Sequence, residues 1–393
     1  MGLLLLGVAS TPAHAESVRS QQWHLDAMGA EEVWEISTGK GVKVAVIDSG
    51  VDATNGDLRG QVLQGKNFAI GEKGDARTDL DGHGTGIAGI IAGTGESGGG
   101  DGAFGLAPDA KIVPIRLPDV HWDNNRPEVI ERSNKLTAEA IRYAADQGVK
   151  VINMSIGWNN GSAELTASVK YALGRGSLLF AAVGNSGDLE NDPEYPGATP
   201  GVVGVGAIGK DLKKTEESQY GPQVDIAAPG DEIVHACGGK TGLCRSHGTS
   251  DATALASATA ALIWSKHPEW TNNQVLRVML NTVSAPTSGN KRNNHVGYGA
   301  VRPLRALKTP GDPGLADEYP LPDLAAGASE SPSAGAAEPA AGKDAETKRP
   351  ADAATAPQGG SSATLWISVG VGAAVITGAA VALSVVRSRR FNG

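Results

Sequence analysis

A chain of 393 residues with a net charge of −9 at pH 7 is long enough for one large globular domain or two ordinary ones. Because the chain is acidic and no stripe of lysine and arginine stands out, we expect no nucleic-acid partner. Glycine is frequent, with 54 residues, and aromatic side chains make up only 4% of the chain, which indicates many tight turns and closely packed elements.

An apolar run opens the chain and ends in Ala13-His14-Ala15, which has the form of a signal-peptidase site. We therefore expect residues 1–15 to be a signal peptide, although its usual positively charged start is missing. The alternative is a buried N-terminal strand. Residues 16–36 are amphipathic, and we expect them to pack on the domain that follows.

The first strand is predicted within residues 42–52, where the apolar run 44–47 is typical of a parallel strand buried on both faces. Asp48 follows at its carboxyl end, which is where open α/β sheets place their sites. His83 then precedes a run of small residues, 86–92, that predicts a closely packed helix.

Strands and helices alternate in the rest of the domain. Apolar runs predict further strands at 111–117, 149–154, 177–183, 201–208 and 224–228. Helical periodicity predicts helices at 136–147, 163–173 and 271–282. Residues 118–133 are expected to form a charged insertion. Repeated strand–helix–strand units with such strands predict an α/β fold with a mostly parallel, doubly wound sheet.

A buried helix is predicted from Ala252 to Trp264, because no residue of this run is charged and the helix therefore has no polar face. It is too short to cross a bilayer comfortably. Ser250 would lie at its N-terminal end, where the helix dipole and free N–H groups stabilise a nucleophile and a developing oxyanion. The same position also suits a simple helix cap.

The chain has two cysteines, Cys237 and Cys244, which flank a glycine-rich loop. In an oxidising compartment they would form a small disulfide, whereas in the cytosol they would remain free thiols. The predicted signal peptide favours the disulfide.

The composition changes at residue 309. Residues 309–362 are rich in Pro, Ala, Gly, Ser and acidic side chains, so they cannot bury enough apolar surface to fold and are expected to form an extended linker. The segment 363–386 is apolar and long enough for one transmembrane helix. Arginines in the tail 387–393 would hold it in the cytoplasm, which leaves the domain outside the cell membrane.

Asp48, His83 and Ser250 occur in the order Asp, His, Ser, which is one of the orders of the serine-protease triad. The residues around them resemble the three signature blocks of the subtilisin-like (subtilase) serine proteases, at 46–50, 81–85 and 248–252. Three further blocks of that family are matched, at 153–157, 182–187 and 195–198. The resemblance implies a three-layer subtilisin-like peptidase domain at 37–308 and a serine endopeptidase acting on polypeptides.

The resemblance implies a role for each member of the triad. Ser250 would attack the scissile carbonyl, and His83 would take its proton as general base. Asp48 would hold the imidazole in the correct tautomer and stabilise its cation.

Four more site residues follow from the resemblance. Asn185 matches the side chain that donates to the oxyanion in this family. Ser155, Ile156 and Gly157 would form an edge that pairs with the substrate backbone. The resemblance implies no cofactor and no metal, and it leaves a structural calcium open.

The chain is most similar to the mycosins, the membrane-anchored subtilases associated with type VII secretion. The shared features are the tryptophans in 16–36, the linker, the single span and the basic tail. In mycosins the segment equivalent to 16–36 wraps the catalytic domain. The resemblance implies the type VII secretion machinery as a partner.

Two residues depart from the subtilase pattern. Ala254 replaces a proline, and Asp251 stands where an apolar residue is common. Asp251 is either a favourable charge in the first helical turn or a charge that raises the pKa of His83 and slows catalysis. Two hypotheses remain: a membrane-tethered serine endopeptidase, and a low-activity protease-fold scaffold subunit of a secretion complex.

Overall fold

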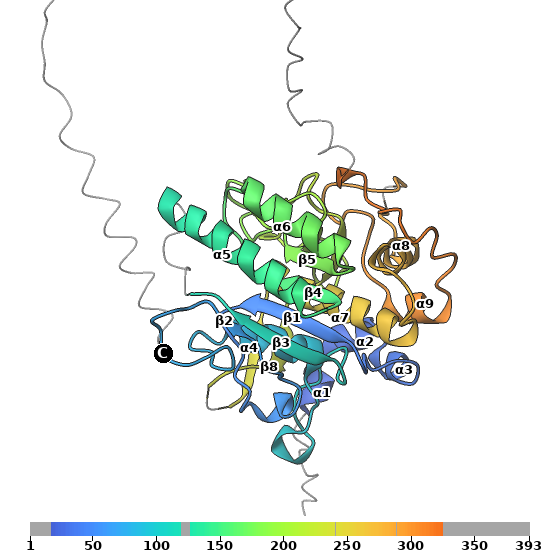
Figure 1. Ribbon diagram of the computed structural model, residues 1–393. Helices are drawn as coiled ribbons and strands as arrows, with labels where there is room; N and C mark the ends of the chain where they lie inside the picture. Colours follow the sequence, from blue (N-terminus) through green and yellow to red (C-terminus); the bar gives the residue numbers. More distant parts are fainter. Residues whose placement is uncertain (1–16, 119–125, 240, 288, 325–393) are drawn as a thin grey trace, which may run out of the picture. The chain divides into compact units, whose positions relative to one another are not determined.

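The computed structural model describes residues 17–118, 126–239, 241–287 and 289–324 (Figure 1). The predicted signal peptide, the predicted membrane span and most of the predicted linker lie outside these residues. In the part that is described, no helix is both long enough and apolar enough to cross a membrane.

The core of the domain is a 7-stranded parallel sheet with the strand order β2-β3-β1-β4-β5-β6-β7. Its strands are β1 (Lys43–Asp48), β2 (Lys66–Asn67), β3 (Lys111–Arg116), β4 (Val151–Met154), β5 (Leu178–Ala182), β6 (Val203–Ile208) and β7 (Ile226–Pro229). Strands β3 and β2 lie on one side of β1, whereas β4 and then β5, β6 and β7 lie on its other side. The direction in which the chain adds strands therefore reverses between β1 and β4. The predicted parallel, doubly wound sheet is confirmed, and open sheets bind ligands at such a reversal.

Helices cover both faces of the sheet and give three layers (Figure 1). They are α1 (Val18–Gln21), α2 (Trp23–Ala27), α3 (Ala30–Trp34), α4 (His83–Ala92), α5 (Pro127–Asp146), α6 (Ala163–Gly174), α7 (Thr249–Lys266), α8 (Asn272–Thr282) and α9 (Pro303–Lys308). Successive side chains of a strand point to opposite faces. Val44 and Val46 therefore pack in one core with α4 and α7, while Ala45 and Ile47 pack in the other with α5 and α6.

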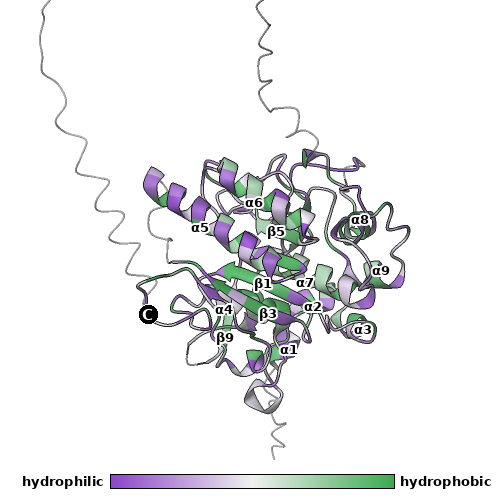
Figure 2. Cartoon of the chain, in the orientation of Figure 1, coloured by the Kyte–Doolittle hydropathy of each residue, from purple (hydrophilic) through white to green (hydrophobic). Residues whose placement is uncertain are grey.

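The most deeply buried helix is α7, which packs against α4 and strands β4 to β7. Every residue from Asp251 to Trp264 is buried, and the helix continues without a break through Ala254. Most of these side chains are small, so the helix axis lies close to the sheet. Figure 2 shows the apolar strands β1 and β3 at the centre and many hydrophilic residues along α5.

The structure corrects the predicted insertion at 118–133, because α5 already begins at Pro127. Proline suits the first position of a helix, since its fixed φ is helical and its missing N–H would have no partner there. Ile130 and Asn134 continue the buried face of the helix, and the charged side chains between them lie on its outer face. That charged outer face obscured the helical pattern.

Both ends of the described chain pack on the domain. Leu25 and Val33 are fully buried, and the indole of Trp23 donates to Asp231 O over 2.9 Å. At the other end, Leu321 is buried and Asp323 Oδ2 accepts from Gly201 N over 2.6 Å. The prediction that an extended linker begins at residue 309 is therefore wrong for residues 309–324.

We predict that Leu262→Ala lowers the free energy of unfolding by roughly 2–5 kcal/mol, because a fully buried side chain of α7 would leave a cavity. The matched control is Leu189→Ala, whose side chain is 71% exposed. It should change the free energy by no more than about 0.5 kcal/mol. Urea denaturation followed by tryptophan fluorescence measures both values, and equal losses would contradict a buried α7.

Candidate active site

Asp48 and His83 meet at the carboxyl edge of the sheet. Asp48 ends β1 and is buried, and His83 begins α4. The imidazole Nδ1 lies 2.8 Å from Asp48 Oδ1 and donates to it. A Cβ at Gly84 would come within 3.0 Å of Gly50 O, so only glycine lets the start of α4 approach β1 this closely.

Asp79 organises the loop that leads to His83, and the sequence analysis missed it. Its carboxylate accepts from Ser49 Oγ (2.9 Å), Gly82 N (2.8 Å) and both Thr85 N (2.8 Å) and Thr85 Oγ1 (2.6 Å). These bonds join the end of β1 to the first turn of α4 and so fix the direction of His83. The only signal in the sequence was an aspartate in a polar turn, which is common in proteins.

Ser250 is the second residue of α7, and Ser155 directly follows β4. The Ser250 hydroxyl donates to Ser155 O over 3.2 Å, and the Ser155 hydroxyl donates to Ser250 O over 2.9 Å. The two segments are therefore held side by side. This brings the predicted nucleophile to the segment 155–157 that was predicted to bind substrate.

Asn185 follows β5, the neighbour of β4 in the sheet. Its Oδ1 accepts from Thr249 N (2.9 Å) and Thr249 Oγ1 (3.0 Å), which fixes the carboxamide beside the N-terminus of α7. The side chain is exposed, and no acceptor for its Nδ2 is found in the part of the chain that the structure describes. An unused donor beside Ser250 is what a developing oxyanion requires.

Three negative charges act on His83 and raise its pKa to about 9. Burial is the largest single effect and lowers the pKa. The charge and hydrogen bond of Asp48, together with the charges of Asp251 and Asp81, outweigh burial. At neutral pH most imidazole rings are therefore protonated and cannot accept another proton.

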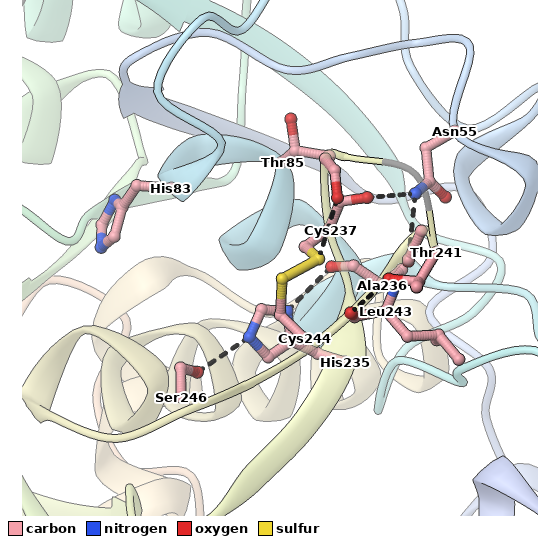
Figure 3. Close-up of a disulfide and its surroundings, with 12 residues drawn as sticks. Asn55, His83, Thr85, His235, Ala236, Cys237, Thr241, Leu243, Cys244 and Ser246 are labelled. Atoms are coloured by element: carbon pink, nitrogen blue, oxygen red, sulfur yellow. Dashed lines mark hydrogen bonds between the residues drawn. A yellow bond between two sulfur atoms is a disulfide. The ribbon is translucent and has the colours of Figure 1, made fainter. Parts of the chain in front are cut away.

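Asp251 is buried and joined to the hairpin formed by β8 (Ile233–Ala236) and β9 (Leu243–Ser246). Ser246 Oγ donates to Asp251 Oδ2 over 2.6 Å. His235 Nε2 lies 2.8 Å from Ser246 Oγ (Figure 3). Burial raises the pKa of Asp251, whereas His235, the Ser246 hydroxyl and His83 lower it. Asp251 is therefore a buried, hydrogen-bonded carboxyl group whose charge acts on His83. It is not a solvated charge at the end of a helix.

Hydrogen bonds link His235, Ser246 and Asp251 in a chain. His235 Nδ1 is 2.8 Å from Ala236 O, which can only accept, so Nδ1 donates. The Ser246 hydroxyl donates to Asp251 Oδ2 and lies between this carboxylate and His235 Nε2. The hairpin therefore holds the carboxylate of Asp251 in a fixed position next to the candidate site.

A disulfide closes the turn of this hairpin. The Sγ atoms of Cys237 and Cys244 are 2.04 Å apart (Figure 3). Asn55 Nδ2 donates to Cys237 O over 2.7 Å and ties the turn to the body of the domain. The bridge stiffens the strand β9 that leads to the nucleophile. As for metals, the described ranges contain no group of three or more His, Cys, Asp or Glu side chains that could hold an ion.

We predict that Asp251→Asn lowers the pKa of His83 from about 9, because it removes one of the negative charges that raise it. The matched control Asp81→Asn should lower it less, since Asp81 is exposed and its charge has the smaller effect. NMR titration of the full chain with ¹³C-labelled histidine measures both. An unchanged pKa in Asp251→Asn would mean that Asp251 is already protonated in the parent.

Known proteins are similar to this chain in sequence and fold. The model of the subtilase family, peptidase S8, matches residues 39–299. The intracellular serine protease of Paenibacillus polymyxa is 35% identical over 245 residues, which are 61% of this chain and 71% of that protein. The crystal structure of MycP1 from the ESX-1 type VII secretion system has a TM-score of 0.67 and 27% identity, covering 78% of this chain and 90% of that chain. A structure of an intact ESX-5 inner membrane complex has a chain with a TM-score of 0.63 and 26% identity, covering 86% of each chain.

These similarities agree with the arrangement of the site. The family match spans more than half of the chain, and Asp48, His83, Asn185 and Ser250 all lie within it. The parallel sheet and the order of these residues along it are those expected of the family. The protein thus belongs to the subtilase family of serine peptidases and is related to the mycosins of type VII secretion.

Proposed function

We propose that this protein is a membrane-anchored serine endopeptidase that hydrolyses peptide bonds outside the cytoplasmic membrane, with Asp48, His83 and Ser250 as its triad. The observation that carries the proposal is the 2.8 Å contact between His83 Nδ1 and Asp48 Oδ1 at the sheet edge where α7 begins with Thr249 and Ser250. A buried carboxylate on one imidazole nitrogen leaves the other nitrogen to exchange a proton with a nucleophile.

In the proposed mechanism, Ser250 Oγ attacks the scissile carbonyl carbon while its proton passes to His83 Nε2. Asp48 stabilises the resulting imidazolium through the Nδ1 hydrogen bond. The oxyanion accepts from Asn185 Nδ2 and from the N–H of Ser250, which lies in the first turn of α7 and has no partner within the helix. His83 then returns the proton to the leaving amine, and a water molecule cleaves the acyl-enzyme by the reverse sequence.

The substrate backbone would bind along Ser155, Ile156 and Gly157. These residues follow β4 at the open edge beside Ser250, and an extended peptide can add there as a further strand. This contact would hold the scissile carbonyl between the hydroxyl of Ser250 and the carboxamide of Asn185.

The proposed location rests on two segments of the sequence, the predicted signal peptide and the predicted membrane span. A signal peptide at 1–15 and a span at 363–386 would anchor the domain outside the membrane, where the Cys237–Cys244 disulfide is stable. The similarity to MycP1 and to a chain of the ESX-5 inner membrane complex supports a partnership with a type VII secretion system.

The second candidate function is a scaffold subunit with little turnover. One specific observation favours it. Asp251 helps to keep His83 protonated at neutral pH, so most molecules lack the neutral imidazole that would act as general base. The two functions can coexist in one protein, because a slow peptidase can also be a structural subunit.

We predict that the full chain reacts with a fluorophosphonate probe and that Ser250→Ala abolishes this labelling. The matched control is Ser265→Ala, which removes a hydroxyl at the other end of α7 and should label like the parent. Labelling is read by gel fluorescence, with circular dichroism as a check of folding. A folded parent that stays unlabelled at pH 9 would contradict the peptidase proposal.

We further predict that the labelling rate rises about tenfold per pH unit from pH 7 to pH 8 and levels off above the pKa of His83, at about 9. The rate rises with pH because the raised pKa keeps His83 protonated at neutral pH, and the fraction of the reactive neutral imidazole increases as the pH rises. In Asp251→Asn the same curve should move to lower pH. A rate that does not change between pH 6 and pH 9 would exclude His83 as the titrating base.

A further inference from the structure

Glu194 is a half-buried carboxylate beside the segment that would bind substrate, and neither the triad nor the oxyanion site uses it. The next residue, Tyr195, pairs with Trp158 through two backbone hydrogen bonds of 2.8 and 3.0 Å. This pairing holds Glu194 next to Gly157, the last residue of the predicted substrate edge.

Two glycines let the carboxylate approach. A Cβ at Gly157 would come within 3.0 Å of Glu194 Oε2, and a Cβ at Gly184 would come within 3.0 Å of Glu194 Cδ. Gly184 directly precedes Asn185, the proposed oxyanion donor. The carboxylate thus lies between the segment that would pair with the substrate backbone and the segment that would hold the substrate carbonyl.

The carboxylate has one fixed oxygen and one open oxygen. Oε1 accepts from Gln219 Nε2 over 2.9 Å, and the same nitrogen lies 2.7 Å from Ser186 Oγ. Oε2 accepts no hydrogen bond from the described residues, yet it is not among their fully buried polar atoms that lack a partner, so solvent reaches it.

No lysine, arginine or histidine of the described ranges pairs with Glu194. Burial raises its pKa to about 7, and no nearby cation offsets this effect. A partly desolvated carboxylate without a cation costs stability, and a cation supplied from outside would compensate for it.

We propose that Glu194 is a specificity-determining residue that binds the Lys or Arg side chain of the substrate residue whose carbonyl is attacked. The inference rests on the proposed peptidase function. That residue would have its backbone against segment 155–157 and its carbonyl at Asn185, so its side chain would run between these segments towards Glu194 Oε2.

The expected preference for a cationic side chain follows from the charge of Glu194. A substrate ammonium or guanidinium group forms a charge-assisted hydrogen bond with Oε2, while Gln219 holds Oε1 in place. An apolar side chain of the same length leaves the carboxylate desolvated and unpaired, and an acidic side chain adds repulsion. Sites built around a buried polar group reject analogues that lack the matching group.

The test uses two tetrapeptide p-nitroanilides that differ only in the residue before the scissile bond, lysine in one and its uncharged counterpart norleucine in the other. Assayed with the full chain at pH 9, the parent should have a kcat/KM at least about tenfold higher for lysine. Glu194→Gln keeps the shape and an oxygen for Gln219, and it should lower kcat/KM for the lysine substrate until the preference over norleucine is lost. The matched control Glu190→Gln removes an exposed charge from the same loop and should keep the preference.

Equal kcat/KM values for the two substrates in the parent would overturn the inference. So would a Glu194→Gln variant that loses both activities in equal proportion while it remains folded by circular dichroism and still labels with fluorophosphonate.

A binding measurement separates this inference from the proposed function. Calorimetry on full-length Ser250→Ala compares peptides that end in arginine or in its neutral isostere citrulline, with and without Glu194→Gln. Tighter binding of arginine that depends on Glu194 would support the inference even if the parent neither labels nor cleaves. Equal binding of the two peptides in a protein that labels would overturn the inference and leave the peptidase function standing.

Discussion

The packing of α7 against the sheet is the constraint on which the rest of the structure depends. Because most of its side chains are small and those from Ala252 to Trp264 are uncharged, the helix lies close to β4 to β7 and brings its N-terminus to the carboxyl edge of the sheet. Its buried hydroxyls are satisfied internally: Thr253 donates to Thr249 O, and Ser257 donates to Asn153 Oδ1. The core of the domain therefore sets the position of Ser250, and the surface loops have little part in it.

The carboxyl edge of the sheet also carries an excess of negative charge. Asp48, Asp81 and Asp251 raise the pKa of His83, and within the described residues no cation pairs with the Glu194 carboxylate beside Gly157. A positively charged substrate residue would reduce this excess of negative charge. The proposed slow turnover at neutral pH and the proposed selection of cationic substrates would thus have one electrostatic origin.

The β8–β9 hairpin connects the N-terminal segment with the site. Gln22 Nε2 donates to Val234 O over 3.0 Å, and on the same hairpin His235 and Ser246 contact Asp251 through hydrogen bonds. His24 is also buried here, and burial, with a contribution from the charge of His235, lowers its pKa to about 3. His24 is therefore packed as a neutral side chain, and the N-terminal segment is in contact with the hairpin that holds Asp251.

By itself the sequence determined the α/β class, the positions of most strands along the chain and the residues of the proposed triad, because apolar runs and short glycine-rich motifs are local patterns. The order of the strands in the sheet came only from the tertiary structure. The sequence did not predict the start of α5 at Pro127, where exposed charges obscured the buried face. The tertiary structure alone revealed Asp79, the partners of Asp251 and the place of Glu194. Their chemistry depends on burial and on contacts with residues distant in the chain, and no local pattern encodes the pKa of a carboxyl group that the fold removes from water.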